Sequence, residues 1–197
     1  MSTSLTQLKA DVLTIVKRRD LIDDIELHTK NAILKIHSTD FYLPDLYENS
    51  FTFAVSATRY SLDAKALVSR WRKSKYFNIL DPNNGEIIRK LNPIEVLNTI
   101  DEYSFIKDYV FYEAGNFINI RASGGELVFG FGAFIYPDVT LTYPSWIADQ
   151  FPYAIQYEAA RTLFLTKGDK ESANSMAELL KEAMTEVKMV GLATIGE

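Results

Sequence analysis

Residues 143–167 read YPSWIADQFPYAIQYEAARTLFLTK, and this stretch decides the fold class. Its apolar side chains recur at every fourth position, namely Ile147, Phe151, Ile155, Ala159 and Leu163. That spacing places them along one face of an α-helix. Proline lacks the amide hydrogen that a helix interior needs, so Pro152 either kinks this helix or begins its main part. We therefore expect a long helix from Ile147 to Lys167.

A second helix is predicted to follow in antiparallel orientation. Gly168 suits the end of the first helix, and Asp169 is a good N-cap for the next one. The apolar residues beyond them share one helical face: Ala173, Met176, Ala177, Leu180, Met184 and Val187. We expect the tail, residues 191–197, to lack a helical continuation.

Another helix pair is predicted at the N-terminus. One apolar stripe consists of Leu5, Leu8, Val12, Ile15 and Val16, and Ser4 is a plausible N-cap for it. After the charged break at Lys17–Asp20, a second apolar stripe consists of Ile22, Ile25, Leu27, Ala32, Ile33 and Ile36. This helix should end between His37 and Asp40, because Ser, Thr and Asp favour caps and turns.

From Phe41 to about Tyr143 the sequence pattern changes and predicts β-strands. Aromatic and β-branched residues come in short runs bounded by turn signals such as Asp81-Pro-Asn-Asn-Gly85. Two hairpins are predicted, formed by Lys75–Leu80 with Glu86–Leu91 and by Tyr109–Tyr112 with Phe117–Arg121.

The longest strand of this region is predicted at Leu127–Tyr136. It has apolar residues on both faces, so we expect it to be central or covered on both sides. Gly130 and Gly132 within it favour a bend or a close approach of another chain segment. Pro93 suits a first helical turn, which makes Ile94–Ile100 the one helix predicted here.

These patterns predict an α+β protein. The N- and C-terminal helix pairs should form a four-helix layer, with a β-rich region inserted between them. The predicted boundaries are residues 1–40 for the N-terminal helices, 41–143 for the β-rich region and 144–197 for the C-terminal helix pair and tail. Residues 1–40 and 144–197 should form one continuous domain.

Composition argues against several kinds of chemistry. The chain has no cysteine, so it offers no disulfide, thiolate nucleophile or cysteine-containing zinc site. Its two histidines, His28 and His37, are nine positions apart and fall on opposite sides of a helix, so they cannot share a metal ion. We therefore predict a non-enzymatic protein with no catalytic residue, metal or cofactor. Without a long apolar stretch, neither a signal peptide nor a membrane span is expected.

One alternative function is DNA binding by the segment Arg70-Trp71-Arg72-Lys73-Ser74-Lys75-Tyr76. It is the sole place where positive charge alternates with aromatic residues, as a nucleic-acid surface requires. The other interpretation of this segment is an edge strand that charge protects from aggregation, with Trp71 and Tyr76 packed inward. A formal net charge of -5 argues against a dominant phosphate-binding surface.

The other alternative is a small enzyme whose acid–base pair comes from scattered carboxylates. Asp40, Asp45 and Glu113 are the candidates that the fold would have to bring together. An enzyme of this kind should have a concave pocket where carboxylates converge.

Several segments resemble one family of viral structural proteins. They are Tyr143-Pro-Ser-Trp-Ile-x-Asp149, Pro152-Tyr-Ala-Ile-x-Tyr-Glu-Ala-Ala160, Gly168-Asp169, Asp20-Leu-Ile-Asp23, Ser38-x-Asp40-Phe-Tyr42 and Tyr112-Glu-Ala-Gly-Asn116. In this order they are similar to segments of the head-tail adaptor, or connector, proteins of short-tailed bacteriophages. The resemblance covers nearly the whole chain, although residues 49–102 match only in their general character.

The resemblance implies a structural virion protein at the head–tail interface, made in the host cytoplasm. Such an adaptor assembles as a ring, expected to be a dodecamer, under the portal and joins it to the tail nozzle. Its partners would be the portal protein, neighbouring copies of itself, tail nozzle or tail fibre proteins, and DNA that passes without sequence specificity during ejection. No membrane is implied.

Five residues are the predicted partner contacts. Aromatic residues make up 13% of the chain, and tryptophan is common at protein interfaces, which points to Trp71 and Trp146. An aromatic-rich β core would account for the same composition. In the tail, Leu192, Ala193 and Ile195 are apolar and lie outside the last helical stripe. We hypothesise that this tail docks on the portal or on a neighbouring subunit.

Overall fold

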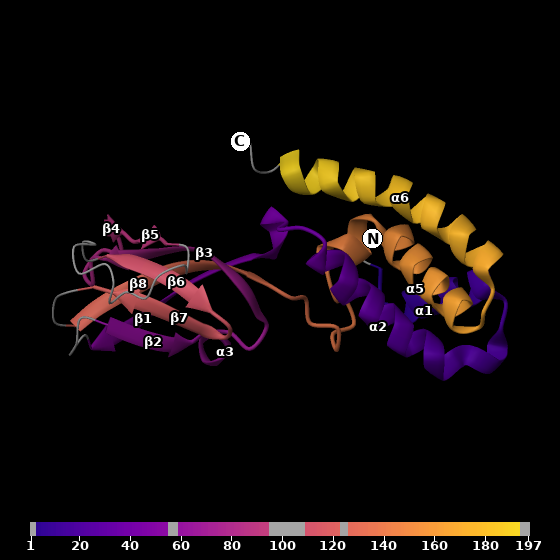
Figure 1. Ribbon diagram of the computed structural model, residues 1–197, viewed down its shortest axis with the longest axis horizontal. Helices are drawn as coiled ribbons and strands as arrows, with labels where there is room; N and C mark the ends of the chain where they lie inside the picture. The colour runs from indigo at the N-terminus through magenta and orange to yellow at the C-terminus, as the bar shows by residue number, and fades with distance from the viewer. Residues whose placement is uncertain (1–2, 55–58, 95–108, 123–125, 194–197) are drawn as a thin grey trace. The chain divides into compact units, whose positions relative to one another are not determined.

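The computed structural model describes residues 3–54, 59–94, 109–122 and 126–193 (Figure 1). The chain divides into two compact units. The helical unit consists of Met1–Asp45 and Tyr136–Glu197, and the β unit consists of Leu46–Ile135. Each unit therefore has its own set of elements and its own core.

The helical unit contains five of the described α-helices. They are α1 (Leu5–Val16), α2 (Ile22–Ser38), α4 (Trp146–Gln150), α5 (Pro152–Thr166) and α6 (Lys170–Ala193), with short 3₁₀ helices η1 (Arg19–Leu21) and η2 (Leu43–Asp45). Local sequence sets their ends as predicted. The Ser4 side chain accepts a hydrogen bond from the Gln7 amide at 3.1 Å, and Asp169 accepts one from the Ser172 amide at 3.0 Å.

Helix α5 lies at the centre of the helical unit. It contacts α1, α2, α4 and α6, and Figure 1 shows it between α6 and the α1–α2 pair. Its buried positions include Ala154, Ala159 and Ala160, which are completely inaccessible to solvent. Small side chains on several sides of one helix let neighbouring helices approach it closely, and larger residues such as Ile155 and Leu163 fill the space between them.

The predicted architecture of a four-helix layer with one inserted β-rich region is wrong. The described residues form six α-helices and two sheets of four strands each. Phe151 has a non-helical backbone (φ -132°, ψ 52°), so the helix expected from Ile147 to Lys167 is two helices, and Pro152 begins the second. Helix α6 packs mainly on α5 and η2.

The β unit is built from two four-stranded sheets. Its elements are β1 (Leu46–Ala54), β2 (Arg59–Asp63), α3 (Ala64–Leu67), β3 (Trp71–Leu80), β4 (Ile87–Lys90), β5 (Asn92–Pro93), β6 (Val110–Ala114), β7 (Phe117–Arg121) and β8 (Glu126–Ile135). One sheet has the order β1-β8-β3-β4 and the other β2-β7-β6-β5. Neighbouring strands are antiparallel, except that β5 runs parallel to β6.

Both predicted hairpins are confirmed, as β3–β4 and β6–β7. The central position of the long strand is confirmed too, because β8 lies between β1 and β3. Gly132 on β8 is paired with Tyr76, and a Cβ atom added at this glycine would lie 2.4 Å from Tyr76 Cε1. The missing side chain is therefore what lets the tyrosine ring approach β8 this closely.

The segment after β4 differs from its prediction. Pro93 ends the short strand β5 instead of beginning a helix, and the Ile94 amide donates a hydrogen bond to the Phe111 carbonyl at 2.9 Å. The rest of the helix predicted at Ile94–Ile100 lies outside the described residues.

Aromatic rings fill the space between the two sheets. Phe77 and Phe131 come from one sheet and Phe111 from the other, and the ring centroids of Phe77 and Phe111 are 5.0 Å apart. All three are buried. Part of the aromatic content of the chain is therefore used in this core.

Candidate interaction surfaces

Trp71, a predicted partner contact, is a core residue of the β unit. It is 8% exposed and its ring packs against Phe77 and Phe131. The indole Nε1–H donates a hydrogen bond to Glu113 Oε1 at 3.2 Å. The polar and the apolar parts of this side chain are thus both engaged within the unit.

Trp146, the second aromatic candidate, begins α4 and is half-buried. Its Nε1–H donates to Asp45 Oδ1 at 2.9 Å, and the other oxygen of Asp45 lies 2.7 Å from Nδ1 of the buried His37. The rings of Tyr42 and His37 pack edge-on around the indole. This cluster joins the end of α2, the turn η2 and the start of α4, so it orders three chain segments.

The predicted tail is partly helical. Gly191, Leu192 and Ala193 continue α6, contrary to the prediction, whereas Ile195 lies outside the described residues. Gly191 is buried against Tyr42, because a Cβ atom added there would lie 2.4 Å from Tyr42 Cδ1. This contact holds the last turn of α6 on the helical unit.

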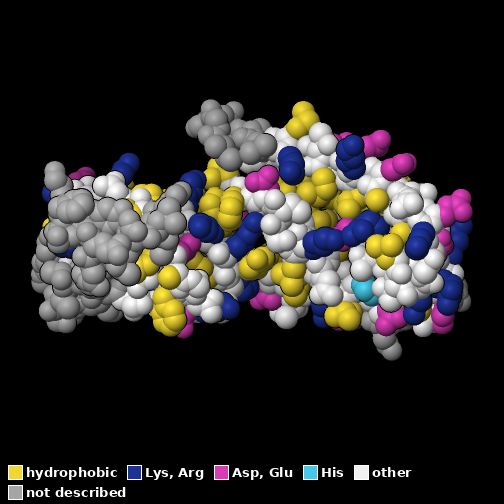
Figure 2. Space-filling view, in the orientation of Figure 1, with side chains coloured by type: hydrophobic (Ala, Val, Ile, Leu, Met, Phe, Trp, Pro, Cys, Tyr) yellow, Lys and Arg dark blue, Asp and Glu magenta, His cyan; other side chains and the backbone are white. Residues whose placement is uncertain are grey.

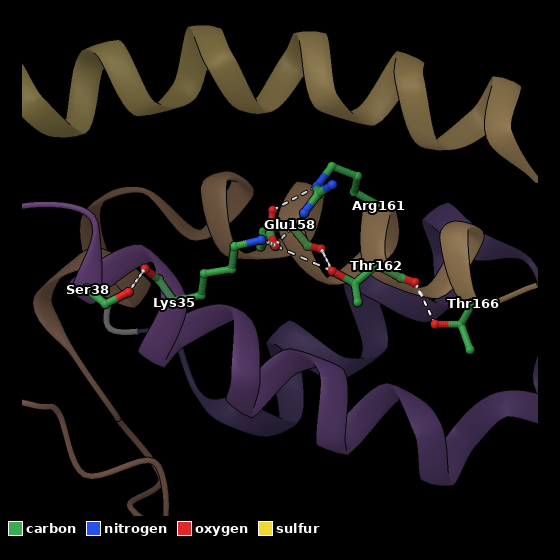
Figure 3. A network of polar contacts seen from close by, with 6 residues as sticks. All are labelled: Lys35, Ser38, Glu158, Arg161, Thr162 and Thr166. Atoms are coloured by element: carbon green, nitrogen blue, oxygen red, sulfur yellow. Dashed lines mark hydrogen bonds and ion pairs between the residues drawn. The ribbon is translucent and has the colours of Figure 1, made fainter.

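A buried carboxylate joins α2 and α5 (Figure 3). Glu158 is 2% exposed, and Lys35 Nζ donates to its Oε1 at 2.6 Å. Arg161 donates to both of its oxygens at 2.9 Å. Burial pushes the pKa of the Glu158 carboxyl upward, but the hydrogen bonds from Arg161 and Lys35 outweigh it and hold the pKa below its ordinary value. Two cations share this one carboxylate, so the cluster carries a surplus of positive charge.

An apolar groove lies beside this cluster. It has a volume of about 310 Å³, and its lining residues are Lys35, Ile36, Thr39, Glu158, Arg161, Ala177, Leu180 and Met184. Figure 2 shows hydrophobic side chains gathered under α6 next to a row of Lys and Arg. We name this surface the groove flank of the helical unit. The Lys35 side chain is 56% exposed, so its charge is accessible at the edge.

The opposite side of α6 has a different character. Leu179, Glu182, Glu186 and Val190 are separated by three, four and four positions and therefore form one strip along the helix. Leu179 and Val190 are 39% and 41% exposed. The hydroxyl of Tyr153 on α5 donates a short hydrogen bond to Glu186. Desolvation and this carboxylate together raise the pKa of Tyr153 to about 12. We name this strip the acidic flank.

The basic segment Arg70–Tyr76 lies at the start of β3. Strand β4 pairs only with Asn78–Leu80 of β3, whereas β8 pairs along the whole strand from Trp71 to Leu80. Among the described strands, this segment therefore has a paired strand on one side only, as expected of a sheet edge. Trp71 is packed inward, also as expected. The Tyr76 hydroxyl bonds to Glu48, and desolvation together with this bond raises the pKa of Tyr76 to about 12. Lys73 Nζ lies 3.6 Å from Glu113. The aromatic rings of this segment are thus occupied within the unit.

The three candidate catalytic carboxylates occur in separate environments. Asp45 contacts His37 and Trp146, and Asp40 lies 3.7 Å from Lys188 Nζ. Glu113 belongs to the β unit, where its Oε1 accepts hydrogen bonds from the amide and hydroxyl of Ser74 at 2.7 and 2.5 Å. Each of these carboxylates therefore has partners that order its own surroundings.

Within the described part of the chain, no group of three or more His, Cys, Asp or Glu side chains is placed to hold a metal ion. None of the described helices is both long enough and apolar enough to span a membrane.

The groove flank was not predicted from the sequence. The pair Glu158 and Arg161 is visible as an i,i+3 spacing, but Lys35 is 123 positions away from Glu158. Nothing in the sequence indicates that these two segments meet. No family model matches the chain, and no curated protein matches it in sequence.

Proposed function

We propose that this chain is a structural assembly protein of the head-tail adaptor type. It would form a ring under a phage portal, join the portal to the tail nozzle or tail fibre proteins, and surround passing DNA without reading its sequence. The role requires side-by-side contact between copies and end contacts with other proteins. It requires no catalytic residue and no cofactor.

The observation that carries the proposal is exposed apolar surface on units that already have complete cores. Among the described residues of the helical unit, the exposed large apolar side chains are Leu27, Phe41, Leu141, Tyr143, Leu165, Leu179, Met189 and Val190. Those exposed on the β unit are Tyr47, Ile87, Ile88 and Phe117. Single exposed apolar residues are ordinary, but an apolar groove beside such residues is typical of surfaces that bind another protein.

The engagement of polar side chains also supports an assembly role over an enzyme. The carboxylates with the most buried surroundings, Glu158 and Asp45, bond to cations or ring N–H groups of the same unit. These contacts join helices to one another. A carboxylate that works as a general acid or base has to reach a substrate proton instead.

Mixing experiments test the proposal. The purified chain is incubated with the portal ring encoded by the same genome, and native mass spectrometry measures the products. The expected result is one complex with a fixed number of copies per portal ring. A chain that stays free at all mixing ratios would contradict the adaptor role.

A parallel measurement separates the alternatives. Retention of the chain on immobilised duplex DNA should be weak and should vary little with salt. Strong retention that falls steeply with salt would favour the DNA-binding function of Arg70–Tyr76.

A further inference from the structure

We propose that the groove flank of the helical unit binds the acidic flank of α6 from a second copy of this chain. The groove offers an apolar lining with a basic edge, and the strip offers apolar and acidic side chains. This inference rests on the proposed function in one respect, that copies of the chain assemble side by side.

The chemistry of the two flanks is complementary. At the groove, Lys35 and Arg161 share the single carboxylate of Glu158. Lys181 and Lys188 follow the same side of α6, seven positions apart, and both are exposed, with Lys188 Nζ 3.7 Å from Asp40. On the other flank, Glu182 and Glu186 stand between Leu179 and Val190. Seating the strip in the groove would pair carboxylates with these cations and bury two exposed aliphatic side chains.

The placement of the flanks on α6 fixes the kind of assembly. Groove residues Ala177, Leu180 and Met184 lie on one side of the helix axis, and the acidic flank lies on the other. A helix cannot turn its far side into a groove that it forms itself, so the occupant must come from another molecule. Contact between two different surfaces is heterologous, and repeating it gives a ring when the rotation closes.

Size and shape also fit this occupant. The groove holds about 310 Å³, enough for a few aliphatic side chains and too small for a folded domain. One strip of a helix presents side chains at intervals of three and four residues, which is the usual way an amphipathic helix fills a groove. We therefore assign Leu179 and Val190 as the side chains that enter it.

Disulfide trapping tests the assignment, because the natural chain has no cysteine and gives no background. Thr39→Cys marks the groove and Glu182→Cys marks the acidic flank, and both positions are exposed. The two single-cysteine chains are mixed at high concentration and oxidised. We expect the mixed 39–182 disulfide to form in higher yield than random pairing of the two chains would give. The control is the same reaction with the exposed Lys65→Cys of the β unit in place of Thr39→Cys, which should give a lower yield of mixed disulfide.

Three outcomes would overturn the inference. The first is a mixed yield no higher than with the Lys65→Cys control. The second is a dominant 39–39 product, which would indicate a symmetric contact between two grooves. The third is loss of the mixed product on Ile195→Asp substitution, since the groove would then hold the C-terminal tail.

A blocking variant gives an independent readout. Ala177→Phe fills the groove without removing a core side chain, and Asn174→Phe adds the same ring on an exposed part of the same helix. In chains that also carry the trapping cysteines, Ala177→Phe should lower the mixed disulfide about tenfold, while Asn174→Phe leaves it unchanged. Circular dichroism of both variants checks that the helices are retained. Equal trapping in both variants contradicts the groove as the docking site.

These results are distinguishable from a failure of the proposed function. A mixed disulfide in a chain that never binds a portal ring would leave the self-contact standing and remove the adaptor role. Portal-bound assemblies without the mixed disulfide would support the adaptor role and contradict the contact between groove flank and acidic flank.

Discussion

The two units use apolar side chains in different ways. In the β unit, Trp71, Phe77, Phe111 and Phe131 fill one core between two sheets. In the helical unit, small residues of α5 bring the helices together, and aliphatic side chains of α6 remain at the surface. The comparison teaches that aromatic residues, which pointed to an interface from sequence, can instead fill a core, as Trp71 does in the β unit. The better interface candidates here are Leu, Met and Val on α6.

The largest expected effect tests the aromatic core. Phe77→Ala removes a ring that is completely buried and contacts Trp71, Phe111 and Phe131. The free energy of unfolding of the β unit should fall by about 3–5 kcal/mol, because the variant leaves a cavity. Urea unfolding followed by hydrogen exchange of β-unit peptides measures the loss.

Phe117→Ala is its matched control. Phe117 lies in the same unit but is 50% exposed, so the same truncation should change stability by less than about 0.5 kcal/mol. Equal losses for the two variants would contradict the assignment of Phe77 to the core.

The next effect compares two carboxylates of the helical unit that each bridge two cations. Glu158 is buried between Lys35 and Arg161, whereas Glu26 bonds to Lys9 and Lys30 with its side chain 43% exposed. Glu158→Gln should destabilise the helical unit by about 2 kcal/mol, since it leaves the partly buried Arg161 and the exposed Lys35 without their shared buried anion.

Glu26→Gln should leave the stability of the helical unit nearly unchanged, because exposed ion pairs contribute little. Urea unfolding monitored by far-ultraviolet circular dichroism measures both variants. If Glu26→Gln lowers the free energy of unfolding as much as Glu158→Gln does, burial is not the reason why Glu158 stabilises the helical unit.

A smaller effect concerns the contact that holds the end of α6. Gly191→Ala adds a methyl group that overlaps the Tyr42 ring. The cost of this overlap, about 1–3 kcal/mol, exceeds the gain of about 1 kcal/mol in helix propensity, so a net loss of about 1 kcal/mol is expected. Thermal unfolding measures it.

The same Gly191→Ala change in a Tyr42→Ala background removes the overlap and should become stabilising. If both backgrounds show the same loss, the overlap with Tyr42 is not its cause.

The smallest expected effect is a pH dependence of the helical unit. The pKa of Glu158 is lower in the folded chain than in the unfolded chain, so its ion pairs stabilise fully above the unfolded value of about 4.3. This contribution is lost as pH falls through the folded pKa. Stability measured between neutral pH and pH 3 should therefore decline on the acid side, and less so in Glu158→Gln. An identical decline in both chains would assign the acid sensitivity to other carboxylates.

Local features could be predicted from sequence because neighbouring residues produce them. Ser4 and Asp169 cap helices through bonds to amides three positions away, and Pro152 begins a helix because it lacks an amide hydrogen. The turn before β4 forms around Gly85, whose φ is +73°. These interactions need no distant part of the chain.

The tertiary structure decided where these elements meet. Sequence periodicity gave each helix an apolar face but not the central place of α5, and a four-helix layer was the wrong assembly. Lys35 meets Glu158, and Trp146 meets Asp45, across more than one hundred positions. Apolar residues that face a core and apolar residues that face a partner protein have the same spacing in the sequence. Folding distinguishes the buried Phe77 from the exposed Val190, because burial depends on what the rest of the chain leaves uncovered.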